Sequence, residues 1–369
     1  MNIENQNTNR IFGLDLIRAI AILFVVFSHI YYLIDDKNPL LIALSGLFGY
    51  AGVELFFVLS GFLIGSILLK KYIDNQFSKK ELFIFLKRRW FRTLPSYYLI
   101  LMINIVLVLI FQYPNYSIWK YFFFLQNLFQ NNITFFTESW SLSIEEWTYI
   151  IMPLILYFGG KLIANKKYAF LLLSISTIVF FHLFRFYNYM NHQVYDMETW
   201  NSQVKSIVFL RIDSIVFGFL IAWFYYFKKE HLKKYCVYLF ILSIHLFFLQ
   251  FLFMNLLGVE IITYPIYFHV FYFTLSSLTF ALALPVFIFW KSAKGIFSNL
   301  VSFLSKISYS MYLLHYSIMS VVVKYIVSEL GINFNKLTII SIYLVLTLSF
   351  SYILYRFYEK PLMDLRDKI

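Results

Sequence analysis

The chain has 369 residues, of which 61% are hydrophobic and 14% are charged, whereas soluble domains carry about 25% charged residues. This composition excludes an ordinary soluble protein and predicts a polytopic membrane protein. The net charge of +12 does not indicate nucleic-acid binding, because membrane proteins concentrate positive charge in cytoplasmic loops, and the single cysteine, Cys236, excludes an internal disulfide.

Ten apolar runs are long enough to cross a bilayer, so we expect an all-α bundle of about ten membrane-spanning helices. The runs cover residues 12–33, 47–69, 95–113, 146–164, 168–186, 206–227, 235–254, 263–290, 302–325 and 337–358. The first run is too long for a signal peptide and lacks a cleavage site, which indicates a retained span. The segment 119–129 is too short to cross and is expected at the interface or in a re-entrant turn.

Basic residues gather in the even-numbered connections between these runs and are scarce in the odd-numbered ones. The basic connections are 70–92, 161–167, 228–234 and 291–294. By the positive-inside rule, both termini are therefore expected in the cytoplasm. The long connections 114–145 and 187–205 then lie outside, where an extracytoplasmic partner would be met.

The first run contains Arg18 and His29, eleven residues apart. On a helix they lie within about 20° of one face and about 16 Å apart along the axis. Asp15 is one turn before Arg18 and is expected to pair with it. A structural interpretation remains open, in which Arg18 reaches the interface and His29 hydrogen-bonds a neighbouring helix.

The second run carries small residues and one carboxylate. Its glycines, Gly52, Gly61 and Gly65, predict close helix packing, while Glu54 is either interfacial or functional. In the next basic stretch, Arg89 and Arg92 are one turn apart. Guanidinium groups suit bidentate recognition of phosphate, but binding of lipid phosphate explains the same charges.

Further polar groups enter the later runs. Ser143 and Glu146 have the spacing of a capping box, which leaves Glu145 as a candidate functional carboxylate. Arg211 and Asp213 are two residues apart, so they cannot face each other on a helix and are expected to pair with other spans. The histidines His182, His245 and His269 are expected to be hydrogen-bonded structural residues. The sequence contains no HExxH, CxxC, Walker A or GxSxG motif, so no metal site is predicted.

These motifs together resemble the acyltransferase 3 family of integral-membrane acyltransferases, which includes bacterial O-antigen and peptidoglycan O-acetylases. The motifs are LDLIRAIAILFVVFSH (14–29), GVELFFVLSGFLI (52–64), FLKRRWFRTLPSYY (85–98), WSLSIEEWTY (140–149), LRIDSIVFG (210–218), ISYSMYLLH (307–315) and YEKP (358–361). Trp147, Thr148 and Tyr149 replace the usual Gln-Phe-Tyr of the family. Some relatives carry an extracytoplasmic esterase-like domain at the C-terminus; we expect residues 1–369 to form a single domain without it.

The resemblance implies an O-acyltransferase of the bacterial inner membrane, without a permanently bound cofactor, that moves acetyl from acetyl-CoA to a hydroxyl of an extracytoplasmic glycan or lipid-linked sugar. The family's Arg-x10-His motif maps onto Arg18 and His29, and its Arg-x-x-Arg motif onto Arg89 and Arg92. We hypothesise that the arginines hold CoA and that His29 acts as general base or as an acyl carrier. Arg211 is a candidate oxyanion donor. The partners expected besides donor and acceptor are membrane lipids, with no nucleic acid.

Three other functions remain open from the sequence. A secondary transporter or flippase of a lipid-linked sugar would also place Arg, His and Glu at membrane depth, but it would leave acetyl-CoA unconsumed. A non-catalytic membrane partner would use the basic stretch around residues 87–92 to bind lipid. A glycan polymerase would change the length of its product. Acetyl cannot be distinguished from a longer acyl group at this point.

Overall fold

The computed structural model describes residues 10–34, 38–74, 77–112, 117–329 and 334–366, and within these ranges it contains helices and no strands. The long helices are α1 (Phe12–Ile34), α2 (Pro39–Ile73), α3 (Lys79–Phe111), α5 (Ser139–Gly159), α6 (Lys166–Asn191), α8 (Ile212–Phe227), α9 (Lys229–Phe248), α11 (Tyr272–Phe289), α12 (Ile296–Leu314), α13 (Met319–Glu329) and α14 (Lys336–Leu354). The short helices are α4 (Trp119–Phe122), α7 (Met197–Trp200), α10 (Met254–Leu256) and α15 (Lys360–Arg366). The all-α prediction is confirmed.

Each of the ten apolar runs coincides with a helix or with a pair of helices. Within the described ranges, seven helices are long and apolar enough to cross a membrane, or eight if the bent pair α12 and α13 counts as one span. The helices α5 and α8 are not among them. A multi-pass membrane bundle is therefore established, while the count of ten crossings stays a prediction.

The run 302–325 is divided between two helices, α12 and α13, which meet at a bend of 65°. One sequence prediction is wrong. The capping-box interpretation of Ser143 and Glu146 fails, because α5 begins four residues earlier, at Ser139. Ser143 instead accepts a hydrogen bond from Gln126 (2.7 Å), and Glu146 accepts one from Thr93 (2.9 Å).

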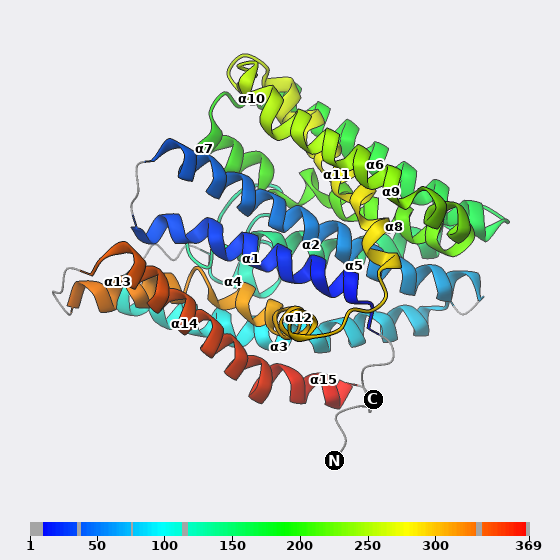
Figure 1. Cartoon of the computed structure of the whole chain (residues 1–369). Coiled ribbons are helices and arrows are strands. Elements are labelled where there is room, and N and C mark those ends of the chain that lie inside the picture. The colour runs from blue at the N-terminus through cyan, green and yellow to red at the C-terminus, as the bar shows by residue number, and fades with distance from the viewer. Residues whose placement is uncertain (1–9, 35–37, 75–76, 113–116, 330–333, 367–369) are drawn as a thin grey trace.

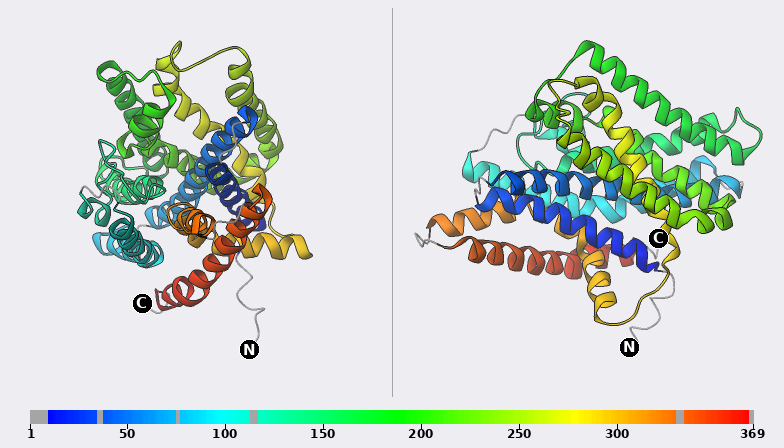
Figure 2. Two further views of the ribbon diagram at one scale, coloured as in Figure 1. Left: turned by 90° about the vertical axis from the view of Figure 1, so that its left-hand side faces the viewer. Right: turned by 45° about the horizontal axis from the view of Figure 1, so that its top comes forward.

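The helices α1 and α2 lie between α6, α9 and α11 on one side and α12 to α14 on the other (Figure 1 and Figure 2). The start of α1 and helix α15 lie at one end of the bundle, and α7 and α13 lie at the opposite end (Figure 1). The two ends of α1 therefore face opposite ends of the molecule, which places Arg18 and His29 in different surroundings.

Small residues let α2 and α8 approach closely, as the sequence predicts. A Cβ atom added to Gly61 would stand 1.8 Å from the carbonyl oxygen of Ile215, and one added to Gly218 would stand 2.3 Å from that of Val58. In a lipid bilayer, burial of apolar surface provides little driving force for association between helices. Their association depends instead on close van der Waals packing of this kind. This contact fixes α8 against the middle of the bundle.

Candidate functional site

At its first turns, α1 carries a network of charges. Asp15 accepts hydrogen bonds from Arg10 (2.7 Å), Arg18 (3.2 Å) and Ser305 of α12 (2.8 Å), and Arg18 also donates to Ser305 (3.0 Å). The predicted pair of Asp15 with Arg18 is confirmed. Arg18 is thereby tied to α12, with its side chain partly exposed.

A second arginine lies between α3 and α5. Arg89 donates to the hydroxyl of Tyr149 (2.6 Å) and lies 4.2 Å from the centroid of that ring. The same hydroxyl donates to Glu145 (2.6 Å), and the Arg89 guanidinium lies 3.5 Å from that carboxylate. The structure thus brings together Arg89 and Glu145, which the sequence identified in separate motifs.

Three arginines gather toward this end of the bundle. Arg92 is exposed on α3, and its charge interacts with Glu145. Arg89 is close enough to Arg18 for their charges to interact. Each of the three side chains is at least partly exposed. Guanidinium groups at this end of the bundle are therefore partly accessible from outside the protein.

At the other end of α1, His29 packs against aromatic rings from the bend between α12 and α13. The ring centroids of His29 and Tyr316 are 4.1 Å apart, and those of His29 and His315 are 4.9 Å apart. Nδ1 of His29 is buried without a hydrogen-bond partner among the described residues, and the same holds for Nε2 of His315. Two unpartnered ring nitrogens therefore belong to neighbouring histidines.

The contact of Nδ1 of His315 determines which of its two ring nitrogens carries the proton. Nδ1 of His315 lies 2.8 Å from the carbonyl oxygen of Tyr312. A carbonyl oxygen can only accept, so Nδ1 carries a proton, and in the neutral ring Nε2 is a hydrogen-bond acceptor. The sequence placed His315 in a motif but gave it no role, since its neighbour His29 is far away in the chain.

Glu138 fixes the bend between α12 and α13. One oxygen of its carboxylate accepts hydrogen bonds from the backbone N–H (3.1 Å) and the hydroxyl (2.7 Å) of Ser317. The other oxygen is buried without a partner in the described part of the chain. Burial raises the pKa of Glu138 to about 7. The sequence gave no signal for this contact, because Glu138 and Ser317 are distant in sequence.

The buried charges of α8 pair with other helices, as predicted. Arg211 forms an ion pair with Glu54 of α2, and Ser277 donates to the same carboxylate (3.2 Å). Asp213 accepts two hydrogen bonds from Arg185 of α6 (2.6 and 2.7 Å). No hydrogen bond or ion pair joins Arg211 to His29 within the described ranges. The role of Arg211 as an oxyanion donor stays a prediction.

Three of the other histidines have structural contacts. His182 hydrogen-bonds Thr274 (3.0 Å), His269 bonds Asn188 (2.8 Å), and His245 bonds the carbonyl of Ile241 in its own helix (2.8 Å). These contacts confirm the structural interpretation. In the described residues no group of three His, Cys, Asp or Glu side chains could hold a metal ion.

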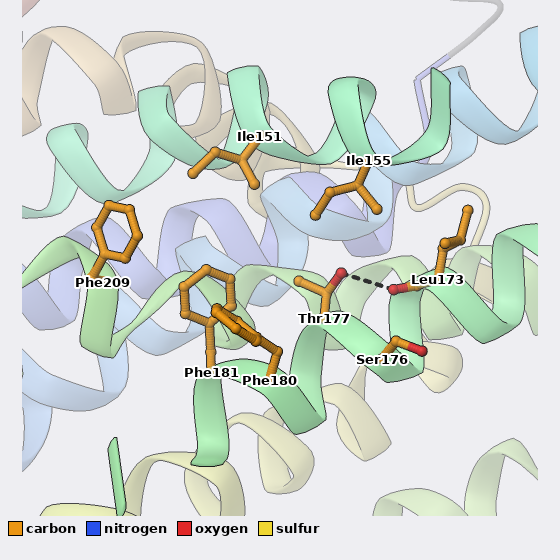
Figure 3. Close-up of a pocket in the computed structure, with 8 residues that line it drawn as sticks. All are labelled: Ile151, Ile155, Leu173, Ser176, Thr177, Phe180, Phe181 and Phe209. Carbon is orange, nitrogen blue, oxygen red and sulfur yellow. Dashed lines mark hydrogen bonds between the residues drawn. The ribbon is translucent and has the colours of Figure 1, made fainter. Parts of the chain in front are cut away.

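An apolar cavity of about 350 Å³ lies elsewhere, against α5 and α6 (Figure 3). Its lining consists of Ile151, Ile155, Leu173, Ser176, Thr177, Phe180, Phe181 and Phe209. Thr177 donates its hydroxyl to the carbonyl of Leu173 (2.7 Å), so this polar group is already satisfied (Figure 3). The cavity contains none of the residues with candidate chemical roles.

The sequence model of a family described as "Acyltransferase domain" matches residues 11–356. The chain is 28% identical over 374 residues to the O-acetyltransferase OatA of Staphylococcus aureus (strain NCTC 8325 / PS 47), which covers 95% of this chain and 57% of that protein. It is 30% identical over 377 residues to the putative O-acetyltransferase SACOL0978 of S. aureus (strain COL), which covers 95% of this chain and 56% of that protein. The chain thus spans less than two thirds of the length of these relatives. No solved structure matches.

Proposed function

Because this chain belongs to the acyltransferase 3 family, we propose that it is a membrane O-acyltransferase. It moves acetyl from acetyl-CoA to a hydroxyl of an extracytoplasmic glycan or lipid-linked sugar in a bacterial inner membrane. The names of its O-acetyltransferase relatives support the type of reaction. The described residues form the acyltransferase domain, and the chain acts as a single domain.

In the proposed topology the chain crosses the membrane ten times and both termini are cytoplasmic. The basic even-numbered connections support this orientation. The position of α15 and the start of α1 at one end of the bundle is consistent with it (Figure 1). Arg18 then lies toward the cytoplasm and His29 toward the outside.

The donor binds from the cytoplasmic side in this proposal. Arg18, Arg89 and Arg92 hold the phosphates of CoA, for which guanidinium groups are well suited. Arg89 is oriented by Tyr149 and Glu145, so its position is fixed before the donor arrives. The pantetheine arm extends along α1 and brings the thioester to His29, about 16 Å away by helix rise.

His29 acts on the acceptor hydroxyl. In this proposal Nδ1–H of His29 donates to Nε2 of His315, a hydrogen bond that is not formed in the structure, and Nε2 of His29 is left as the base. Nε2 takes the hydroxyl proton as that oxygen bonds to the thioester carbon. The carbon–sulfur bond then breaks, and the imidazolium returns the proton to the CoA thiolate. Alternatively, the same arrangement of residues serves a two-step reaction, in which His29 is first acylated by the thioester and the acyl group then passes to the acceptor hydroxyl.

The observation that carries this proposal is the pair of unpartnered ring nitrogens on His29 and His315. The test is mass spectrometry of surface glycans from cells with and without the gene. We expect glycans that are heavier by one acetyl group only when the gene is present. Identical glycan masses in both strains would contradict the proposal, provided that the protein is detected in the membrane.

A flippase or transporter is the second candidate, and one observation favours it. The helices α12 and α13 meet at a bend of 65° and together are long and apolar enough to form one broken span, and broken helices are common at the substrate sites of transporters. A transporter moves its substrate without consuming acetyl-CoA. Release of free CoA by the purified protein in the presence of acceptor therefore distinguishes the two functions.

A further inference from the structure

One cation on the outer side of the bundle has no carboxylate partner. Lys205 ends the helical turn Asn201–Lys205, which follows α7, and its side chain is partly exposed. Its ammonium group lies 5.5 Å from the centroid of the Trp140 ring. No ion pair to a carboxylate involves Lys205 in the described part of the chain. A half-buried cation without a counterion is costly, and an anionic ligand would offset this cost.

The backbone holds Lys205 and Trp140 in fixed relative positions. The side-chain amide of Asn127 donates to the carbonyl of Ser206 (2.6 Å) and to that of Trp140 (3.0 Å). Arg211 donates to the carbonyl of Lys205 itself (3.4 Å). These hydrogen bonds fix the backbone at both residues. The ammonium group of Lys205 then lies over the Trp140 ring.

This pair is connected to the proposed catalytic histidine. Ser141, the neighbour of Trp140, hydrogen-bonds the hydroxyl of Tyr312. The Tyr312 ring lies 5.6 Å from His315, which in turn lies 4.9 Å from His29, centroid to centroid. The charge of Lys205 is also close enough to act on the His29 imidazole. The pair thus lies on the acceptor side of the proposed reaction.

We propose that Lys205 and Trp140 bind the acceptor, and that the acceptor is a sugar carrying a carboxylate or phosphate near the hydroxyl that is acylated. The proposal rests on the function proposed above. The partly exposed side chain of Trp140 provides an apolar contact for the sugar ring beside Lys205. Lys205 acts as a point charge, which suits both kinds of anion because it does not demand a bidentate geometry.

The test compares charged and neutral acceptors with the full-length protein in nanodiscs and acetyl-CoA. The probes are methyl β-glucuronide for a carboxylate, glucose 1-phosphate for a phosphate, and methyl β-glucoside as the neutral sugar. For Lys205→Met we expect kcat/KM to fall about tenfold or more for an anionic acceptor, as for loss of a charged hydrogen bond, and to stay unchanged for the glucoside. Lys205→Arg should retain the preference for anionic over neutral acceptors. If Lys205→Met lowers kcat/KM more for the glucuronide, the natural acceptor carries a carboxylate. If it lowers kcat/KM more for glucose 1-phosphate, the natural acceptor carries a phosphate.

Lys229→Met is the matched control. Lys229 also lies over an aromatic ring, 5.6 Å from the centroid of Tyr225, but it is exposed at the start of α9. This variant should behave like the wild type with all acceptors. An equal fall in kcat with charged and neutral acceptors in Lys205→Met would overturn the proposal, because Lys205 would then act on the shared transition state.

The pH dependence gives a second readout. Burial and the charge of Arg211 lower the pKa of Lys205 to about 8, while Glu54 opposes this shift. The ratio of kcat/KM for glucuronide to that for glucoside should therefore be constant below pH 7 and fall as the pH rises through 8. Titration of His29 affects both acceptors and cancels in the ratio. A ratio that does not change between pH 7 and pH 10 would contradict the assignment.

Measurement of acceptor binding in the absence of acetyl-CoA tests the acceptor subsite independently of the proposed acyltransferase function. Saturation-transfer NMR with methyl β-glucuronide should show binding to the wild type and its loss in Lys205→Met. If binding depends on Lys205 but no acceptor is acylated, the subsite is supported and the acyltransferase function is contradicted. If acylation occurs without preference for an anion, the subsite is wrong and the function stands.

Discussion

His315 lies beside His29, with ring centroids 4.9 Å apart, and in the proposed mechanism it has the part that a carboxylate has in the catalytic triad of hydrolases. Its Nδ1–H donates to the carbonyl of Tyr312, so in the neutral ring Nε2 is a hydrogen-bond acceptor. A carboxylate in the place of His315 would carry a desolvation cost when ionised. In the proposed mechanism His315 fixes the tautomer of His29 without that cost.

Replacement of His315 tests this positioning role. His315→Phe keeps the ring but removes the acceptor, so His29 loses its tautomer preference and kcat should fall about tenfold to a hundredfold. The KM for acetyl-CoA should not change. ¹⁵N NMR of labelled histidines should show His29 protonated at Nδ1 in the wild type and mixed in the variant. His245→Phe, at an exposed position, is the control; an unchanged tautomer in His315→Phe would refute the role.

Glu138 predicts a pH dependence of stability. Its pKa is about 7 in the folded protein, above the ordinary value, so folding favours the protonated form. Its contribution to stability is complete below about pH 4.5 and is lost as the pH rises to about 7. Glu138→Gln keeps an acceptor for Ser317 without a charge. From pH 5 to pH 8, the melting temperature of the wild type should fall relative to this variant; a constant difference would contradict the assignment.

Individual residues differ in how far the sequence predicts them. The contact of Asp15 with Arg18 follows from helix periodicity alone, and the separate partners of Arg211 and Asp213 follow from their spacing. The roles of His315 and Glu138 do not follow from any local pattern. Their partners come from other helices, and only the packing of the bundle brings them together.

At the scale of elements, two packed helices and one bent pair shape the site. Gly61 and Gly218 bring α2 and α8 into backbone contact, which holds Arg211 against Glu54. Gly61 was readable in the sequence because only small residues permit this approach, whereas its counterpart Gly218 was not singled out. The 65° bend was not readable, since the run 302–325 contains no proline or glycine to mark a break and Glu138, which contacts the bend, lies outside the run.

Gly61→Ala tests the contact between α2 and α8. The added Cβ would overlap the backbone of Ile215, so the helices must separate, and we expect a loss of about 1–3 kcal/mol of stability. Gly46→Ala is the matched control in the same helix, because nothing lies within 4 Å of its Cβ position. Melting of the two variants in detergent measures the difference. Equal melting temperatures would show that the close approach is not required.

At the scale of the whole molecule, the proposed function places the donor site at one end of α1 and the acceptor site at the other. Composition and apolar runs were sufficient to predict a helical membrane bundle, because the bilayer permits few other folds. They were not sufficient for the number of crossings, since α5 and α8 are too polar or too short to be assigned by length and hydropathy. The orientation rests on the positive-inside rule.

Cysteine labelling tests the orientation of the molecule. In a Cys236→Ser background, Lys336→Cys and Lys291→Cys place single thiols at the proposed outer and inner ends. A membrane-impermeant maleimide added to intact cells should label Lys336→Cys but not Lys291→Cys. Both should be labelled in opened cells. The reverse pattern in intact cells would invert the topology and with it the donor and acceptor sides.

The central claim is that His29 transfers an acyl group from CoA to an acceptor. The most direct measurement is release of free CoA, together with acylated acceptor, by purified wild type and His29→Ala in nanodiscs, with His245→Ala as a control for loss of a histidine. We predict equal release by the wild type and His245→Ala, and none above background by His29→Ala at equal yield and melting temperature. Release by His29→Ala at the wild-type rate would contradict the account.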